Sequence, residues 1–226
     1  MKKLLLLLLV FSSVAAFSQF SFSQVKTVYV VPETAKIYYN GHEVGNGSYQ
    51  VKFKKDDFVV LKFEAPGYIT RTVKLFKNNP KKTISYELFV DEAMQSSIGA
   101  EDGVDLANKF FSVTCKKGMD PDVVWKRLMN IAINNFENVE VRDKAAGWIK
   151  TAWVNSQFLY QVVRTRLEIQ IQFTEEDALA YRVRISSEIA DKDCGLNDQC
   201  FSTYNRILKK YEQVISELQT SLGSNF

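Results

Sequence analysis

Residues 162–189, VVRTRLEIQIQFTEEDALAYRVRISSEI, decide the fold of the second half of this 226-residue chain. Apolar and polar side chains alternate along both ends of this stretch, which is the period of a β-strand with one buried face. We therefore expect two long strands, Val162–Phe173 and Leu179–Ile189, with one face buried and the other wet. The apolar face consists of Leu167, Ile169, Ile171, Phe173, Tyr181, Val183, Ile185 and Ile189.

One helix is predicted before this strand pair in the sequence and one after it. Asp120 and Pro121 give the start of the first helix, and apolar residues then recur with helical spacing. The second helix is expected over Phe201–Leu222, with Gly223 as its stop signal. Further strands are expected at Lys109–Cys115, Val139–Arg142 and Trp148–Val154. Residues 109–223 thus have the order βαβββα, an α+β domain of helix-grip type with two helices on one face of an antiparallel sheet.

Part of this domain resembles a known family. In VWKRLMNIAINNFENVEVRDKAAGWIKTAW, residues 124–153, an early Trp on the helix is followed by an aromatic, a strand and then Asp143, Gly147, Ile149 and Trp153. This order is similar to the repeated domains of BamC-type outer-membrane assembly lipoproteins and their helix-grip relatives. The resemblance implies a scaffold or interaction role. The chain departs from those lipoproteins because it has no lipid-attachment cysteine near its start.

Residues 25–90 form a different kind of domain, in which the dominant period is two and turn residues separate short runs. A small antiparallel β domain, a sandwich of two sheets, is the economical arrangement. The expected strands are Thr27–Val31, Lys36–Tyr39, Tyr49–Phe53, Phe58–Phe63, Tyr68–Leu75 and Thr83–Phe89.

The turns of this β domain resemble those of a PEGA domain. Asn40-Gly41, Gly45 and Gly67-Tyr68 match the family pattern, while Asn46-Gly47-Ser48 replaces its usual Thr-Pro pair. The resemblance implies an envelope or cell-surface accessory module without catalytic residues.

His42 is the only histidine in the chain and follows the Asn40-Gly41 hairpin signal. No cluster of metal-ligand spacing and no G-x-S-x-G motif accompanies it. We therefore predict an exposed turn histidine and no catalytic residue, metal or cofactor, so the protein is not expected to be an enzyme. A Ser-His-Asp site, which would make the chain a hydrolase, would have to use this histidine.

The N-terminus reads as a secretory signal peptide over residues 1–19. Lys2 and Lys3 precede a short apolar run and then small residues, with cleavage expected between Ala16 and Gln24. No later stretch is long enough for a transmembrane segment. Removal of the two lysines lowers the formal charge from +3 to +1, which does not suit nucleic-acid binding. A secreted or periplasmic location is predicted.

Residues 91–108 carry five acids and no base and lack periodicity. We expect an acidic linker in solvent, with contact to the basic β domain as the alternative.

The cysteines suggest one disulfide. Cys194 and Cys200 lie close together in a compartment that oxidises thiols, so we expect them to be bonded, which leaves Cys115 as a buried thiol. The acids around this loop also allow a calcium site, but their spacing does not fit an EF-hand, and solvated acids are favoured.

The polar side of the sheet offers the candidate site. It should present Trp148, Lys150, Arg164, Arg166, Arg182 and Arg184. The simple interpretation is a solvated face with ordinary cross-strand ion pairs. The functional interpretation is a surface for an anionic or aromatic-stacking partner, with Trp148 as anchor. The sequence thus predicts a non-catalytic envelope scaffold that binds a protein or glycan. The alternative is a carrier of a hydrophobic small ligand or lipid in a cavity under the last helix.

Overall fold

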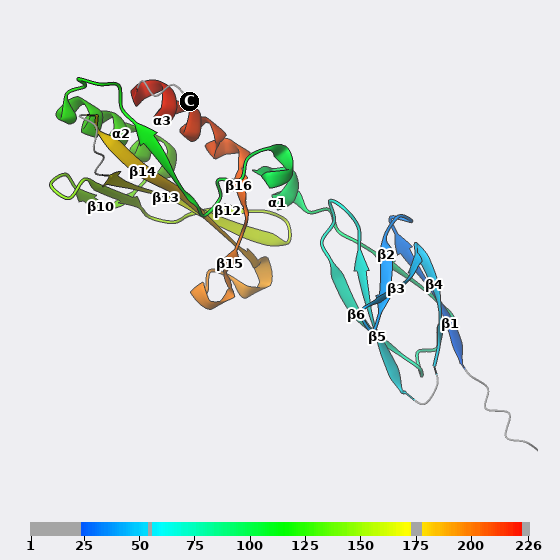
Figure 1. Ribbon diagram of the computed structural model, residues 1–226. Helices are drawn as coiled ribbons and strands as arrows, with labels where there is room; N and C mark the ends of the chain where they lie inside the picture. The colour runs from blue at the N-terminus through cyan, green and yellow to red at the C-terminus, as the bar shows by residue number, and fades with distance from the viewer. Residues whose placement is uncertain (1–23, 54–55, 173–177, 223–226) are drawn as a thin grey trace, which may run out of the picture. The chain divides into compact units, whose positions relative to one another are not determined.

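The computed structural model describes residues 24–53, 56–172 and 178–222, and the chain divides into two compact units, residues up to Val90 and residues from Asp91 onward. Strands dominate both units (Figure 1), which confirms the β-rich fold expected from the sequence. No helix of the described residues is long and apolar enough to cross a membrane. The predicted signal peptide, residues 1–19, lies outside the described residues.

The first unit consists of two sheets that share one hydrophobic core. In the three-stranded sheet, β1 lies between β4, which is antiparallel to it, and β7, which is parallel. The other sheet has the antiparallel order β3-β2-β5-β6. The strands are β1 (Val25–Val31), β2 (Lys36–Tyr39), β3 (His42–Asn46), β4 (Ser48–Lys52), β5 (Phe58–Glu64), β6 (Arg71–Phe76) and β7 (Thr83–Glu87).

The core of the first unit follows from the alternation along β1 and β5. Val28 and Val30 of β1 and Leu61 and Phe63 of β5 are at most 1% exposed and belong to one apolar cluster. Every second residue of each strand contributes to this cluster, as the period of two predicts.

The second unit contains a seven-stranded antiparallel sheet in the order β10-β11-β13-β14-β15, with β12 beside β13 and β9 beside β14. A small sheet pairs β16 with β8. The strands are β8 (Ser97–Gly99), β9 (Phe110–Thr114), β10 (Val139–Asp143), β11 (Trp148–Thr151), β12 (Val154–Gln157), β13 (Gln161–Gln172), β14 (Ala180–Asp191), β15 (Ser202–Thr203) and β16 (Arg206–Leu208). The helices are α1 (Glu92–Gln95), α2 (Pro121–Phe136) and α3 (Glu212–Leu222), with 3₁₀ turns η1 (Ala100–Asp102), η2 (Lys192–Cys194), η3 (Asp198–Cys200) and η4 (Lys209–Tyr211).

The two long strands predicted from the alternating stretch are β13 and β14. Their register runs unbroken from Gln161 opposite Asp191 to Gln172 opposite Ala180. Leu167 and Ile169 of β13 and Val183 and Ile185 of β14 are completely buried on one side of the sheet. Phe173, which was expected on the same face, lies outside the described residues.

Helices α2 and α3 cover the apolar side of this sheet (Figure 1). The Asp120 side chain caps α2 by accepting hydrogen bonds from the backbone N–H groups of Asp122 and Val123, as expected for an N-cap before proline. Phe136 at the end of α2 stacks on Tyr211 just before α3, with ring centroids 4.6 Å apart. The two helices thereby close the core around large side chains.

The acidic linker expected over residues 91–108 is wrong. These residues belong to the second unit, where Ala93, Ile98 and Ala107 are buried in its core. Strand β8 pairs with β16, and Ile98 lies opposite Ile207. Two of the five acids are held by a cation that is distant in sequence, because Arg206 forms ion pairs with Glu101 and Asp102.

The long helix expected over Phe201–Leu222 is also wrong in its first half. Helical structure begins only at η4 and α3, and the preceding residues form β15 and β16. The apolar spacing of Phe201, Tyr204 and Ile207 matches a helix. Residues Arg206–Leu208 instead form backbone hydrogen bonds with β8, which a helix at this position could not make. The predicted strand Trp148–Val154 likewise divides into β11 and β12, which both pair with β13.

Candidate functional site

Six predicted side chains lie on one face of the large sheet. Trp148 is opposite Gln170, Lys150 is opposite Glu168, and Arg166 stands two residues before Glu168 on the same strand. Side chains two apart on a strand, or opposite one another on neighbouring strands, point to the same side of a sheet. All six therefore lie opposite the helices. We call this set the arginine face: Trp148, Lys150, Arg164, Arg166, Arg182 and Arg184.

The hairpin before Trp148 depends on glycine. Gly147 has φ +60, and a Cβ at this position would lie 2.6 Å from the Cβ of Ile171. A larger residue would strain the turn and push β10 and β11 away from β13. Gly147 thus allows the close approach to β13 that places Trp148, the first residue of β11, on the arginine face.

Three aromatic rings complete the arginine face, and none of them was assigned to it from the sequence. The Arg166 guanidinium lies 4.2 Å from the Trp153 ring centroid, and Arg164 lies 4.6 Å from the same ring. Phe201 contacts Arg164 from another side at 4.0 Å. Phe110 of β9 lies 4.9 Å from Arg182 and 4.5 Å from Arg184. These are cation–π distances.

One signal could have placed Phe110 on this face. β9 alternates Phe110, Ser112 and Thr114 on one side with Phe111 and Val113 on the other, and only Val113 is completely buried. Phe110 is 40% exposed, so the strand turns an aromatic residue toward the polar side. The contact with Arg184 depends on the pairing of β9 with β14, which is not visible in the local sequence.

Arg164 is a largely enclosed cation of the face. Its side chain is 11% exposed and forms ion pairs with Glu188, at 2.6 Å, and with Asp198. Burial by itself lowers the pKa of this guanidinium, but its hydrogen bonds to Asp198 and Glu188 raise the pKa above the ordinary value. Arg164 therefore stays charged and ties three segments together.

Glu168 is the most buried acid of the face, at 6% exposure. Its carboxylate accepts hydrogen bonds from Arg184 and, at 2.6 Å, from Gln170. Burial raises the pKa of this carboxyl, but the hydrogen bonds from Arg184 and Gln170 and the charge of Arg166 bring the pKa below its ordinary value. Glu168 is therefore ionised at neutral pH.

Arg166 differs from the other arginines of the face. Across the part of the chain that the structure describes, it makes no ion pair or hydrogen bond, and its Nε is shielded from solvent without a partner. Arg182 donates to Gln170, at 2.7 Å from its Nε, and Lys150 lies 3.7 Å from Glu140. Arg166 and Arg182 are thus the cations of the face that form no ion pair with a carboxylate of the described residues, and Arg166 also lacks a hydrogen bond.

Trp148 is half-buried, not open to water as predicted. Its Nε1 is shielded from solvent and has no hydrogen-bond acceptor among the described residues. The indole therefore lies within the surface of the face, where it is less accessible as an anchor than expected.

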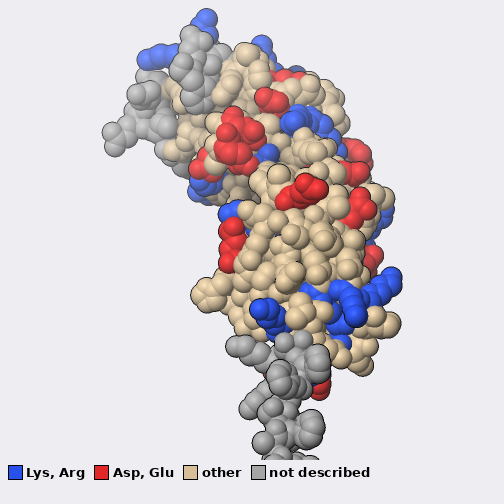
Figure 2. Space-filling view, turned by 90° about the vertical axis from the view of Figure 1, so that its right-hand side faces the viewer, with Lys and Arg blue, Asp and Glu red and all other residues tan. Residues whose placement is uncertain are grey.

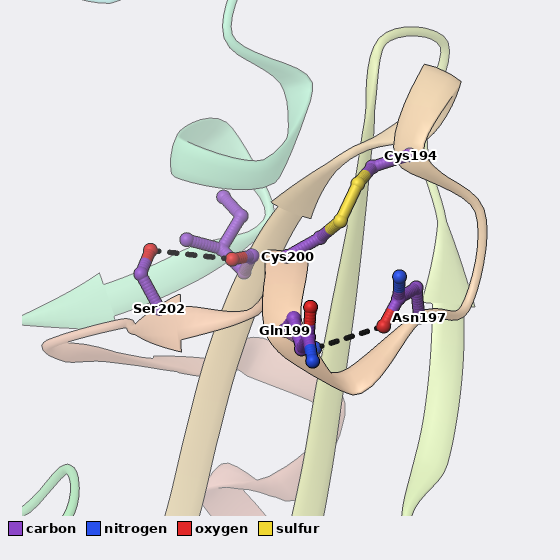
Figure 3. Close-up of a disulfide and its surroundings, with 6 residues drawn as sticks. Cys194, Asn197, Gln199, Cys200 and Ser202 are labelled. Atoms are coloured by element: carbon purple, nitrogen blue, oxygen red, sulfur yellow. Dashed lines mark hydrogen bonds between the residues drawn. A yellow bond between two sulfur atoms is a disulfide. The ribbon is translucent and has the colours of Figure 1, made fainter.

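The predicted disulfide is confirmed. Cys194 and Cys200 are bonded, with their Cα atoms 6.2 Å apart (Figure 3). Within the loop the Asn197 side chain accepts a hydrogen bond from the Gln199 backbone N–H at 3.1 Å, as Figure 3 shows. The bonded loop carries Asp198, which pairs with Arg164, so the disulfide closes one end of the arginine face. Cys115 is buried, and burial raises the pKa of its thiol to about 11.

His42 belongs to the first unit, where it is exposed at the start of β3. Asn40 and Gly41 before it have φ +50 and +79, the left-handed pair of a tight hairpin. In the described ranges, no three His, Cys, Asp or Glu residues are grouped so that they could hold a metal ion.

The central strand of the first unit exposes uncharged side chains. Val25, Tyr29 and Val31 of β1 are 40–53% exposed on the outer face of their sheet. Figure 2 views the side on which β1 and β4 are drawn in Figure 1 and shows a broad area there without charged groups.

Comparisons with known proteins give little further information. No protein-family model matches the chain, and no curated protein matches it. Among solved structures, the chain is similar to a protein of unknown function from Bacteroides fragilis NCTC 9343, provisionally described as membrane-associated. The identity is 10%, 73% of this chain and 96% of that chain are covered, and the TM-score is 0.26.

Proposed function

We propose that this protein is a secreted or periplasmic, non-catalytic interaction module of the cell envelope. It binds a protein or glycan partner through the arginine face. The observation that carries the proposal is the gathering of four arginines and three aromatic rings on one sheet face, with Arg166 left without a carboxylate partner. Guanidinium groups on aromatic rings are common at the centre of binding surfaces.

The location is supported by two features of the chain. The first residues have the charged, apolar and small-residue parts of a signal peptide. The Cys194–Cys200 disulfide fits a compartment that oxidises thiols. N-terminal sequencing of the exported protein should find a start between residues 17 and 24, and a mature protein that begins at Met1 would contradict export with cleavage.

Each domain contributes to the proposed role. We assign the first unit as a PEGA-like module and the second as a variant of the helix-grip type, in which a β16–β8 pair replaces the first half of the last helix.

The carrier alternative requires space under α3. Val214, Leu218 and Leu222 are completely buried there, which favours a filled core.

The test is affinity capture from envelope extract, with the captured proteins and glycans identified by mass spectrometry. Arg166→Ala is expected to reduce recovery of the specific partner at least tenfold, because it removes a cation that forms no ion pair or hydrogen bond with the described residues. Arg142→Ala is the matched control, since Arg142 is exposed and lies opposite Ile149, on the other side of the sheet. Equal losses with the two variants would contradict the arginine face as the binding surface.

His42→Ala tests the absence of catalysis. An exposed residue beside a hairpin turn contributes little stability, so activity in cells and the melting curve should both stay unchanged. Loss of function with a normal melting curve would instead indicate catalysis or metal binding in the first unit.

A further inference from the structure

A pocket of about 480 Å³ lies within the second unit, between the end of β12 and the chain around β16. Its walls include Ser156, Gln157 and Phe158 on one side and Leu208, Lys209 and Lys210 on the other. We call it the lysine pocket. Its volume is in the range of small-molecule sites, which is roughly 300–1,000 Å³.

The lysine pocket is separate from the arginine face. Ser156 pairs with Val163, whose side chain is completely buried in the core under the helices. Because paired residues point to the same side of a sheet, Ser156 lies on the helix side, opposite the arginine face. A ligand in this pocket would not touch Arg166 or Trp153.

Backbone hydrogen bonds hold the two walls in place. The Lys209 N–H donates to the Ser96 carbonyl at 2.9 Å, and the Phe158 N–H donates to the Gln161 carbonyl at 2.8 Å. The Lys209 ammonium donates to the Gln95 carbonyl, also at 2.9 Å. The pocket is therefore formed by fixed backbone, which suits a preformed site.

The pocket wall is cationic. Its lining residues include two lysines and no acid, and neither lysine forms an ion pair within the described ranges. Lys209 uses one of its three N–H groups on Gln95, and the Lys210 ammonium lies 4.9 Å from the Tyr211 ring centroid. Both lysines are exposed, so their ammonium groups are accessible to an anion. Burial lowers the pKa of Lys210, and the charge of Glu137 raises it in part.

The remaining wall is mixed. Leu208 is 2% exposed and Phe158 is half-buried, and together they offer apolar contact. The Ser156 hydroxyl is shielded from solvent and is therefore not offered to a ligand. A site with apolar contact and two cations matches a ligand with an anionic head and a short apolar tail.

We propose that the lysine pocket binds a small amphiphilic anion, a carboxylate or a phosphate monoester with a short hydrocarbon tail. This ligand site goes beyond the proposed partner binding and depends on different residues. The two lysines hold the head group, and Phe158 and Leu208 contact the tail.

The test is calorimetric titration of the mature protein with five probes. Octanoate and octyl phosphate carry both parts of the ligand, acetate and inorganic phosphate carry the head alone, and octanol carries the tail alone. We expect the first pair to bind at least tenfold more tightly than the single-part probes, because a charge-assisted hydrogen bond is worth about tenfold or more. The tighter member of the pair identifies the head group.

Variants assign the binding to the pocket. Lys210→Gln, and Lys209→Gln together with Lys210→Gln, should weaken octanoate or octyl phosphate binding about tenfold or more. Lys210→Gln alone keeps the Lys209–Gln95 hydrogen bond, so it reports on the ligand even if the double variant unfolds. Lys192→Gln, at an exposed position just before the disulfide loop, should have no effect.

Three results would overturn the proposal: no binding of either two-part probe, octanol binding as tightly as octanoate, or unchanged affinity in both lysine variants with normal melting curves. Arg166→Ala should leave probe binding intact. A failure of the arginine face in partner capture is thereby distinguished from a failure of the lysine pocket.

Discussion

Arg164 and Arg166 are neighbours on one strand face, yet the residues around them give them different roles. Arg164 lies between Trp153 and Phe201 and joins Glu188 to Asp198. Arg166 shares only the Trp153 ring. A guanidinium that holds two carboxylates contributes to folding, whereas one without an acid partner is available to a ligand.

This difference predicts opposite outcomes for two alanine substitutions. Arg164→Ala should lower the free energy of unfolding by about 2 kcal/mol, because it leaves the partly buried Glu188 without its charged donor. Arg166→Ala should cost less than about 1 kcal/mol, the size of one cation–π contact. Chemical denaturation of both variants provides the measurement. A larger loss for Arg166→Ala would show that Arg166 is structural.

Glu168 predicts a dependence of stability on pH. Its folded-state pKa is below the ordinary value of 4.5, so its contribution is fully present above about pH 4.5 and is lost as the pH falls through the lower folded-state pKa. Glu168→Gln should therefore destabilise the protein at pH 7 and change little at the lowest pH where the protein remains folded. The difference in melting temperature between wild type and variant, followed against pH, tests this. A constant difference at all pH values would contradict it.

Among the elements, those with local signals were predictable from the sequence. Strands β13 and β14 follow from strict alternation, and α2 follows from Asp120, Pro121 and its apolar spacing. Ile98 and Ile207 are residues of β8 and β16, and their pairing joins segments about a hundred residues apart that carry no strand-length alternation. The contacts of Phe110 with Arg184 and of Phe201 with Arg164 also depend on residues that are distant in sequence. The sequence therefore predicted the cations of the arginine face but not these aromatic partners.

The contribution of the disulfide loop to stability can be tested directly by substitution. Replacing Cys194 and Cys200 together by serine should lower the free energy of unfolding by about 2 kcal/mol, from the loop-closure entropy of so short a loop. Because Asp198 would lose its fixed position beside Arg164, partner capture should weaken as well. Denaturation and intact mass after alkylation without reductant measure these effects. Three alkylated thiols in the wild-type protein would contradict the bond itself.

At the scale of the whole molecule, the boundary between the units falls at Val90 and Asp91, not at a linker that ends near residue 108. The acids of this segment indicated a solvated tether because Arg206, the partner of Glu101 and Asp102, is remote in sequence. Ser97 and Ile98 are buried against the chain that leads to α3, so the segment closes the second unit.

This boundary predicts how fragments fold. A fragment of residues 91–226 should unfold cooperatively, because it contains β8, β16 and the complete core of the second unit. A fragment of residues 109–226 lacks Ala93, Ile98 and Ala107 and leaves Arg206 without its two acids. It should be less stable by more than about 3 kcal/mol, because the apolar side chains that residues 91–108 cover become exposed to water. Urea denaturation followed by circular dichroism compares the two fragments. Equal stability would mean that residues 91–108 contribute nothing to the second unit, and the solvated linker predicted from the sequence would then be correct.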